Sequence, residues 1–240
     1  MENRKSLLKL SSVDIPDTKL SIRIPTVGEI LEDESTYYNI VSSLTASPFQ
    51  YMVQLDDMGI DFTKITDYEL FKMLFPAYTK SDLSILLGDL DISDFSIYRG
   101  KNQEEYIYSS SNNIEINEKV YHDLVNTIRK INAFEKINYR PGNESARKYL
   151  LEKERKKQKR NAKKPYEPYL EKLVIALVNT SEFPYNYDSC MDLSIYRFHQ
   201  SFKQIQHKIA FDKTMIGVYA GTVDTSRLSN KDNLSWIPNK

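Results

Sequence analysis

The chain has 240 residues, a mass of 28.0 kDa and 40% hydrophobic residues, which allow one domain or two small ones and exclude disorder throughout. Its 33 Lys and Arg residues balance 33 Asp and Glu residues, so no overall charge draws it to nucleic acid or acidic lipid. Its single cysteine, Cys190, excludes an internal disulfide. The first residues lack the apolar run of a signal peptide, and no stretch approaches the roughly 18 apolar residues that cross a bilayer. We therefore expect a soluble intracellular protein.

The N-terminal part carries the start signals of helices. Glycine is sparse, at seven residues, which argues against an architecture of hairpins and phosphate loops. Thr26 and Glu29 have the spacing of a capping box, and the helix that they open should reach about Ser43. Three further helices are expected to begin at Ser47, Thr66 and Asp82.

The middle of the chain changes its period. Residues 95–116 contain three short alternating segments, which predict a small β-hairpin or a three-stranded meander. Asn117 then caps a helix with a wide apolar stripe from Val120 to Ile131. The predicted fold class is therefore mainly α, a multi-helix bundle with this small β element in its middle.

A basic run follows. Residues 147–164 hold ten basic and two acidic residues, a net charge of +8, and after Leu151 they offer nothing to bury. Such a segment is expected to be a solvated helical arm or a linker. The basic patch proper comprises Arg155, Lys156, Lys157, Lys159, Arg160, Lys163 and Lys164. We expect three parts: an N-terminal module over 1–140, the linker or arm over 141–168, and a C-terminal helical module over 169–240.

The C-terminal module contains a heptad-like seam. Ser194 should cap a helix whose apolar residues recur at steps of three and four, which is typical of a helix that packs lengthwise on another. These residues are Ile195, Phe198, Phe202, Ile205 and Ile209. His207 falls on the polar side, where we expect it to be solvated. Gly221 should end the helix, and Trp236 in the tail is expected to fold back as an anchor.

Residues capable of catalysis do not form a recognisable set. Cys190 could pair with His122, His199 or His207, but nothing local activates the thiol, and internal packing explains it. Asp56, Asp57 and Asp61 lack the spacing of a calcium loop. Phosphate-loop and dinucleotide signatures are missing as well. We expect no catalytic residues, no cofactor and no metal, and hence no enzyme.

The basic run leaves two explanations open. A +8 patch could neutralise several phosphates and bind nucleic acid in a salt-sensitive way. Residues 13–105, however, hold 17 acidic and seven basic residues, so the patch could instead be compensated within the chain or by an acidic neighbouring subunit. The run lacks interleaved aromatic residues for base stacking, and nucleic acid is therefore the less favoured partner.

Several segments resemble a known group of phage proteins. They are Ile24–Ile30, Tyr51–Asp57, Gly59–Phe62, Asp67–Phe71, Leu193–Phe198 and Gly217–Asp224. These segments are similar to helical proteins from the tail-gene clusters of phages that infect low-GC Gram-positive bacteria. The resemblance covers both ends of the chain but omits residues 95–116 and the basic run. Its motifs are structural and imply no active site.

The resemblance implies a tail assembly chaperone or a baseplate accessory protein, which acts in the host cytoplasm and binds the tape-measure protein or neighbouring baseplate subunits. The seam residues and Trp236 are the candidate contacts, although internal packing is the favoured interpretation of the seam. One alternative is a permanent subunit of the virion tail or baseplate. A second is a nucleic-acid-binding regulator that uses the basic patch. No membrane association is expected, and the sequence leaves oligomerisation open.

Overall fold

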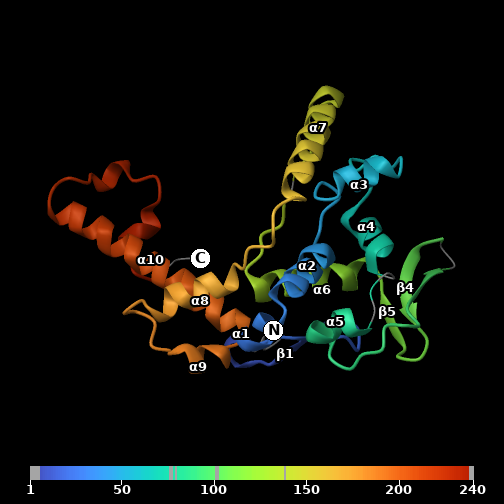
Figure 1. Ribbon diagram of the computed structural model, residues 1–240, viewed down its shortest axis with the longest axis horizontal. Coiled ribbons are helices and arrows are strands. Elements are labelled where there is room, and N and C mark those ends of the chain that lie inside the picture. Colours follow the sequence, from blue (N-terminus) through green and yellow to red (C-terminus); the bar gives the residue numbers. More distant parts are fainter. Residues whose placement is uncertain (1–5, 76–77, 79, 101–102, 138, 238–240) are drawn as a thin grey trace.

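The computed structural model describes residues 6–75, 78, 80–100, 103–137 and 139–237. Most of its elements are helices, and the strands form one two-stranded and one three-stranded antiparallel sheet (Figure 1). The meander lies at one end of the molecule, the C-terminal helices lie at the other, and one helix rises from the middle (Figure 1). The predicted mainly α class with a small β meander is confirmed.

The described residues begin with a short 3₁₀ helix and a small sheet that the sequence patterns did not indicate. The 3₁₀ helix η1 spans Leu7–Lys9, and strands β1 (Ser12–Asp14) and β2 (Ser21–Arg23) pair antiparallel. Each strand has only three residues, too few for alternation to be recognised. The turn between them contains Asp17 in the left-handed region, at φ 60°.

The first predicted helix is two helices. Thr26 forms the expected capping box with Glu29 and opens α1 (Val27–Glu32). The expected continuation to Ser43 is wrong at Asp33, whose φ of −150° interrupts the helix. The Asp33 side chain accepts a hydrogen bond from the backbone N–H of Thr36 and so caps α2 (Glu34–Leu44). A capping side chain competes here with helix continuation, as acidic residues do at helix starts.

The N-terminal caps of α1 and of α10 (Ile195–Tyr219) lie side by side. Thr26 and Ser194 form an isolated antiparallel bridge, in which the N–H of Val27 donates to Leu193 O and the N–H of Ile195 donates to Pro25 O, both at 2.8 Å. Gly28 lies close beneath Met191, since an added Cβ would come within 3.3 Å of the Met191 carbonyl oxygen. These contacts join segments from opposite ends of the sequence.

The next helices follow the prediction in part. α3 spans Met52–Asp57, α4 spans Asp67–Leu74 and α5 spans Lys80–Leu87. Thr66 and Glu69 form the expected capping box of α4. The expected start at Ser47 is wrong, because the backbone first makes turns and α3 begins five residues later. Gln50 does accept from the backbone N–H of Ser47, so the local contact forms without a helix.

The meander and the helix after it form as expected. β3 (Ser96–Arg99), β4 (Glu105–Ser109) and β5 (Ile114–Ile116) make an antiparallel sheet in the order β3-β4-β5. Asn117 caps α6 (Glu118–Asn132), whose apolar stripe is buried in the core. Ala133 ends α6 in the left-handed conformation, at φ 55°.

The C-terminal half is helical. It contains α7 (Glu144–Asn161), α8 (Leu170–Val178), α9 (Tyr187–Met191), α10 (Ile195–Tyr219) and the 3₁₀ helices η3 (Thr225–Arg227) and η4 (Lys231–Leu234). Gly221 follows α10 with φ 71°, as a helix-ending glycine does. None of the helices that the structure describes is both long and apolar enough to cross a bilayer.

Two apolar clusters hold these elements. The larger one combines the N-terminal sheet, α1, α2, α6 and the meander with residues of α8, α9 and α10. The smaller one lies around α3 and includes Leu70 of α4 and Leu151 of α7. The C-terminal helices thus share a core with α2 and α6, and the division into separately folding modules stays a prediction.

Candidate functional site

α7 forms an arm that rises from the middle of the molecule beside α3 (Figure 1). Leu151 is its buried residue and packs into the smaller cluster. Four residues further on, the guanidinium of Arg155 lies 2.7 Å from Asp56 and 2.6 Å from Asp57 at the end of α3. The arm is therefore attached by the apolar packing of Leu150 and Leu151, by the ion pairs of Arg155, and by an ion pair of 3.6 Å between Arg147 and Asp61.

The attachment neutralises part of the charge of the basic run. Arg155 is neutralised by acidic residues from the N-terminal half, as the intramolecular explanation requires. Lys157 lies 3.3 Å from Glu154, one turn back along α7. Lys156, Lys159, Arg160, Lys163 and Lys164 are exposed and make no ion pair with the residues that the structure describes. The outer face of the arm is thus left positively charged.

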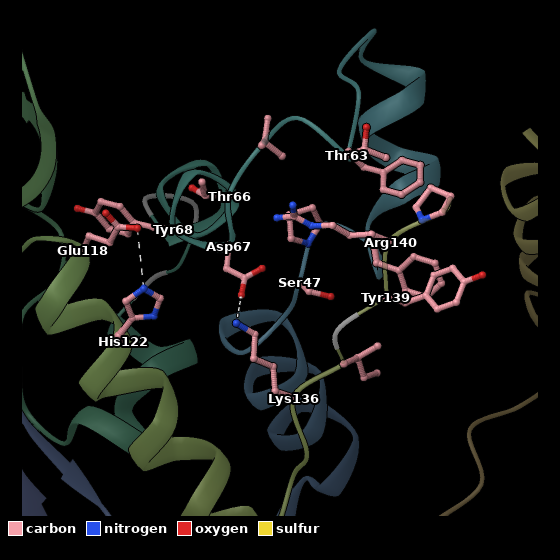
Figure 2. Close-up of a pocket in the computed structure, with 16 residues that line it drawn as sticks. Ser47, Thr63, Thr66, Asp67, Tyr68, Glu118, His122, Lys136, Tyr139 and Arg140 are labelled. Carbon is pink, nitrogen blue, oxygen red and sulfur yellow. Dashed lines mark ion pairs between the residues drawn. The ribbon is translucent and has the colours of Figure 1, made fainter. Parts of the chain in front are cut away.

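A pocket of about 450 Å³ lies between the base of the arm, the start of α4 and the first turns of α6, and Figure 2 shows its lining residues. Lys136 Nζ lies 2.8 Å from Asp67 Oδ2, and His122 Nε2 lies 3.8 Å from Glu118 Oε1. Arg140 and Tyr139 lie on the other side of the view from His122 (Figure 2). Asp67 is thus ion-paired with Lys136, and this pair ties the chain that leads into α7 to α4. Glu118 faces the imidazole of His122.

The cysteine and the acidic triplet have structural partners. Cys190 is fully buried in α9, and this burial raises the pKa of its thiol, which disfavours the nucleophilic thiolate. No hydrogen bond joins it to a histidine among the residues described. Asp56 and Asp57 bind Arg155, and Asp61 accepts hydrogen bonds from Thr63, which lower the pKa of Asp61.

The predicted seam divides along α10. Ile195 and Phe198 are fully buried and Ile205 is nearly so, which assigns these three residues to internal packing. Phe202 is half-buried against the same core. Ile209, farther along the helix, is 36% exposed.

The seam face continues past the core into solvent. Ile216 follows Ile209 by seven residues, which is two turns and therefore the same face of the helix. Ile216 is 68% exposed and Tyr219 is 83% exposed. We call Ile209, Ile216 and Tyr219 the outer seam. Apolar side chains recurring on one exposed helix face are typical of a contact surface.

The tail folds back along α10, as predicted, but on another side of it. Gln204 donates to Trp236 O at 2.8 Å, and His207 Nε2 lies 2.7 Å from Ser235 O. Both positions lie about 100° or more around the helix axis from Ile205, so the tail does not follow the seam face. His207 is part-buried by this contact, which corrects its expected solvation. The contact is made by the backbone of Trp236, and its indole is 57% exposed, so the side chain is not the anchor that the sequence predicted.

Glu34, at the start of α2, joins α2 to α8, a link that sequence reasoning missed. Its carboxylate accepts hydrogen bonds from the Tyr166 hydroxyl and from the backbone N–H groups of Tyr169, Leu170 and Glu171. Burial by itself would raise its pKa, but these hydrogen bonds outweigh burial and lower it. Glu34 therefore serves as an N-terminal cap for α8 from 136 positions away.

Comparison with known proteins adds one finding. Residues 156–239 match the family model described as YomV second domain. This is a phage-derived family, of the Bacillus phage SPbeta-like kind, so the match supports a phage origin. The matched segment begins within α7 and includes α8, α9, α10 and the tail. No curated protein and no solved structure matches the chain.

Proposed function

We propose that this chain is a non-enzymatic phage protein that acts by protein contacts during assembly of the tail or baseplate. The observation that carries the proposal is the outer seam, since it is exposed and lies within the segment that matches the phage-derived family. A helix that continues its buried apolar face into solvent favours another helix as its partner. The resemblance of both chain ends to tail-cluster proteins supports a tail subunit or the tape-measure protein as that partner.

The partner would lie lengthwise on the outer seam. Ile209 and Ile216 would bury aliphatic area, and Tyr219 would add a large ring with a polar tip, a combination common at contact surfaces. A long apolar tape-measure helix would aggregate before the tail encloses it, and covering such a face would prevent this. In this role the protein works in the host cytoplasm.

Site-specific photo-crosslinking in phage-infected cells tests the proposal. A crosslinking amino acid placed at Tyr219 should capture a tail or baseplate protein, identified by mass spectrometry. The same amino acid at Tyr98, which is 43% exposed on the meander, is the matched control. Equal capture at both positions, or capture of host proteins alone, would contradict the proposal.

Purified particles distinguish the two forms of this role. An assembly chaperone should be absent from them, whereas a permanent virion subunit should be present at a fixed ratio to the other tail proteins. Mass spectrometry of particles measures both.

A nucleic-acid-binding role is the second candidate, and the outer face of α7 favours it. Tyr149 is 64% exposed and shares that face with Lys153, Lys156 and Arg160. Retention on immobilised DNA that is lost near about 0.2 M salt would support this role. Replacing Lys153, Lys156 and Arg160 by glutamine should then abolish retention, while replacing Lys203, Lys208 and Lys213 on α10 should not.

A further inference from the structure

A second cavity, of about 550 Å³, lies where α2, the end of α6, the approach to α8 and α10 meet. We call it the tyrosine pocket. Its lining includes Tyr38, Phe134, Tyr166, His199, Phe202 and Lys203. Its size is within the range of small-molecule sites.

The walls of the tyrosine pocket are aromatic. The rings of Tyr38 and Phe134 lie 6.2 Å apart and nearly parallel, at 14°. Phe202 lines it from α10, and Tyr166 and Tyr169 stand at its rim, 50% and 56% exposed. Flat walls of this kind fit a planar ring, which they contact by stacking or edge-on packing.

Two buried polar atoms in this lining lack partners. His199 is only 7% exposed, and its Nε2 atom has no hydrogen bond within the described part of the chain. The hydroxyl of Tyr38 is likewise buried and unpaired there. Asn132 also lines the pocket, and both of its amide atoms have partners. Its Oδ1 atom accepts a hydrogen bond from the Tyr37 hydroxyl at 2.6 Å, and its Nδ2 atom donates to Ile128 O at 3.0 Å. Unpaired buried groups are unusual and favour a bound polar group as their partner.

The charge around the tyrosine pocket favours an anion. Lys203 is exposed at its rim and makes no ion pair with any residue that the structure describes. Glu167, also in the lining, is paired with Lys172 at 3.3 Å. The nearby carboxylate of Glu34 already accepts four hydrogen bonds. Among the charged side chains of the lining, Lys203 is thus the one without an ion-pair partner in the described part of the chain.

We propose that the tyrosine pocket binds a small planar aromatic molecule that carries an anionic group. The ring would lie against Tyr38, Phe134 and Phe202, a polar atom of the ligand would bond His199 or the Tyr38 hydroxyl, and the anion would face Lys203. Lys203 lies about 120° around α10 from Ile209, so this site is separate from the outer seam and does not depend on the proposed assembly role.

A matched series of indole probes tests the proposal by isothermal titration calorimetry on the full chain. Indole-3-acetate, indole-3-acetamide and tryptamine share a ring and differ in charge. The anion should bind about three- to fivefold more tightly than the neutral amide, as an exposed charge pair allows, and the cation should bind most weakly. Tightest binding of tryptamine, or no binding by any of the three, would overturn the proposal.

Two variants locate the binding. Lys203→Gln should remove the preference for the anion but keep the ring affinity, whereas Lys213→Gln, at an exposed lysine farther along the same helix, should change neither. His199→Phe should weaken all three probes, with circular dichroism to verify its folding. Backbone NMR shifts on adding indole-3-acetate should centre on residues near Tyr38 and Phe134. Shifts centred elsewhere, or an anion preference that survives Lys203→Gln, would refute the assignment.

Discussion

The two halves of α10 carry one sequence pattern but have different surroundings. In the first half, Ile195, Phe198 and Ile205 are buried against the body of the protein. In the second half, Ile209 and Ile216 continue the same face into solvent. An apolar helix face therefore predicts a contact surface. Whether that surface is buried by the same chain depends on which elements lie opposite it.

The largest expected effect comes from the buried half. Phe198→Ala removes a ring that is 0% exposed and touches Phe183, so it should lower the free energy of unfolding by about 3–5 kcal/mol. Urea denaturation followed by circular dichroism measures this. A loss below about 1 kcal/mol would mean that the inner seam is not packed as described.

His199, in the buried half of α10, should make the free energy of unfolding depend on pH. Burial, aided by the charge of Lys203, lowers the pKa of His199 from 6.5 to about 4. The unfolded chain therefore binds this proton more readily, and stability should fall as the pH drops from above 6.5 towards 4. Between pH 7 and 5.5, where most carboxylates stay ionised, the loss should be about 1 kcal/mol.

His199→Phe should remove that part of the pH dependence, which urea denaturation at both pH values measures. His122→Phe is the matched control, because His122 is half exposed in the pocket of Figure 2. Equal slopes in His199→Phe and the unmodified protein would show that His199 is not buried in the neutral form.

The ion pairs that attach the arm to α3 should contribute less to the free energy of unfolding. Arg155→Gln breaks two ion pairs whose side chains are more than a third exposed, so we expect only a small loss in the free energy of unfolding. Lys159→Gln, an exposed position on the same helix, should cost nothing measurable. If the two variants have the same stability in urea, the ion pairs of Arg155 contribute nothing measurable to holding the arm.

The smallest expected effect on stability is in the outer half of α10. Ile216→Ser should change the free energy of unfolding by at most about 0.5 kcal/mol, because the side chain is already in solvent. It should nevertheless reduce crosslinking from Tyr219. A stability loss like that of Phe198→Ala would show that Ile216 packs within the protein.

Local signals were sufficient wherever a few adjacent residues decide the outcome. Thr26 with Glu29 and Thr66 with Glu69 formed the predicted capping boxes, and the stripe of α6 is buried as its period indicated. The prediction failed at Ser47, where the same kind of signal opens a series of turns and not a helix. It also failed at Asp33, where one residue both ends a helix and caps the next.

The candidate sites depended more on distant contacts. The seam was visible as a pattern, but its division into inner and outer halves was not, because burial depends on which elements lie opposite. Tyr38 and His199 gave no signal in the sequence, since they are far apart along the chain and meet only in the folded protein.

The sequence by itself thus determined the helix caps, the apolar stripes, the meander and the basic run, because short-range geometry and local charge produce them. Tertiary structure alone decided that Glu34 caps α8, that Arg155 is neutralised by α3, and that the face of α10 is buried at one end and free at the other. The physical reason is that burial and charge pairing are properties of neighbours in space, and such neighbours can be far apart in sequence, as Glu34 and Leu170 are at 136 positions.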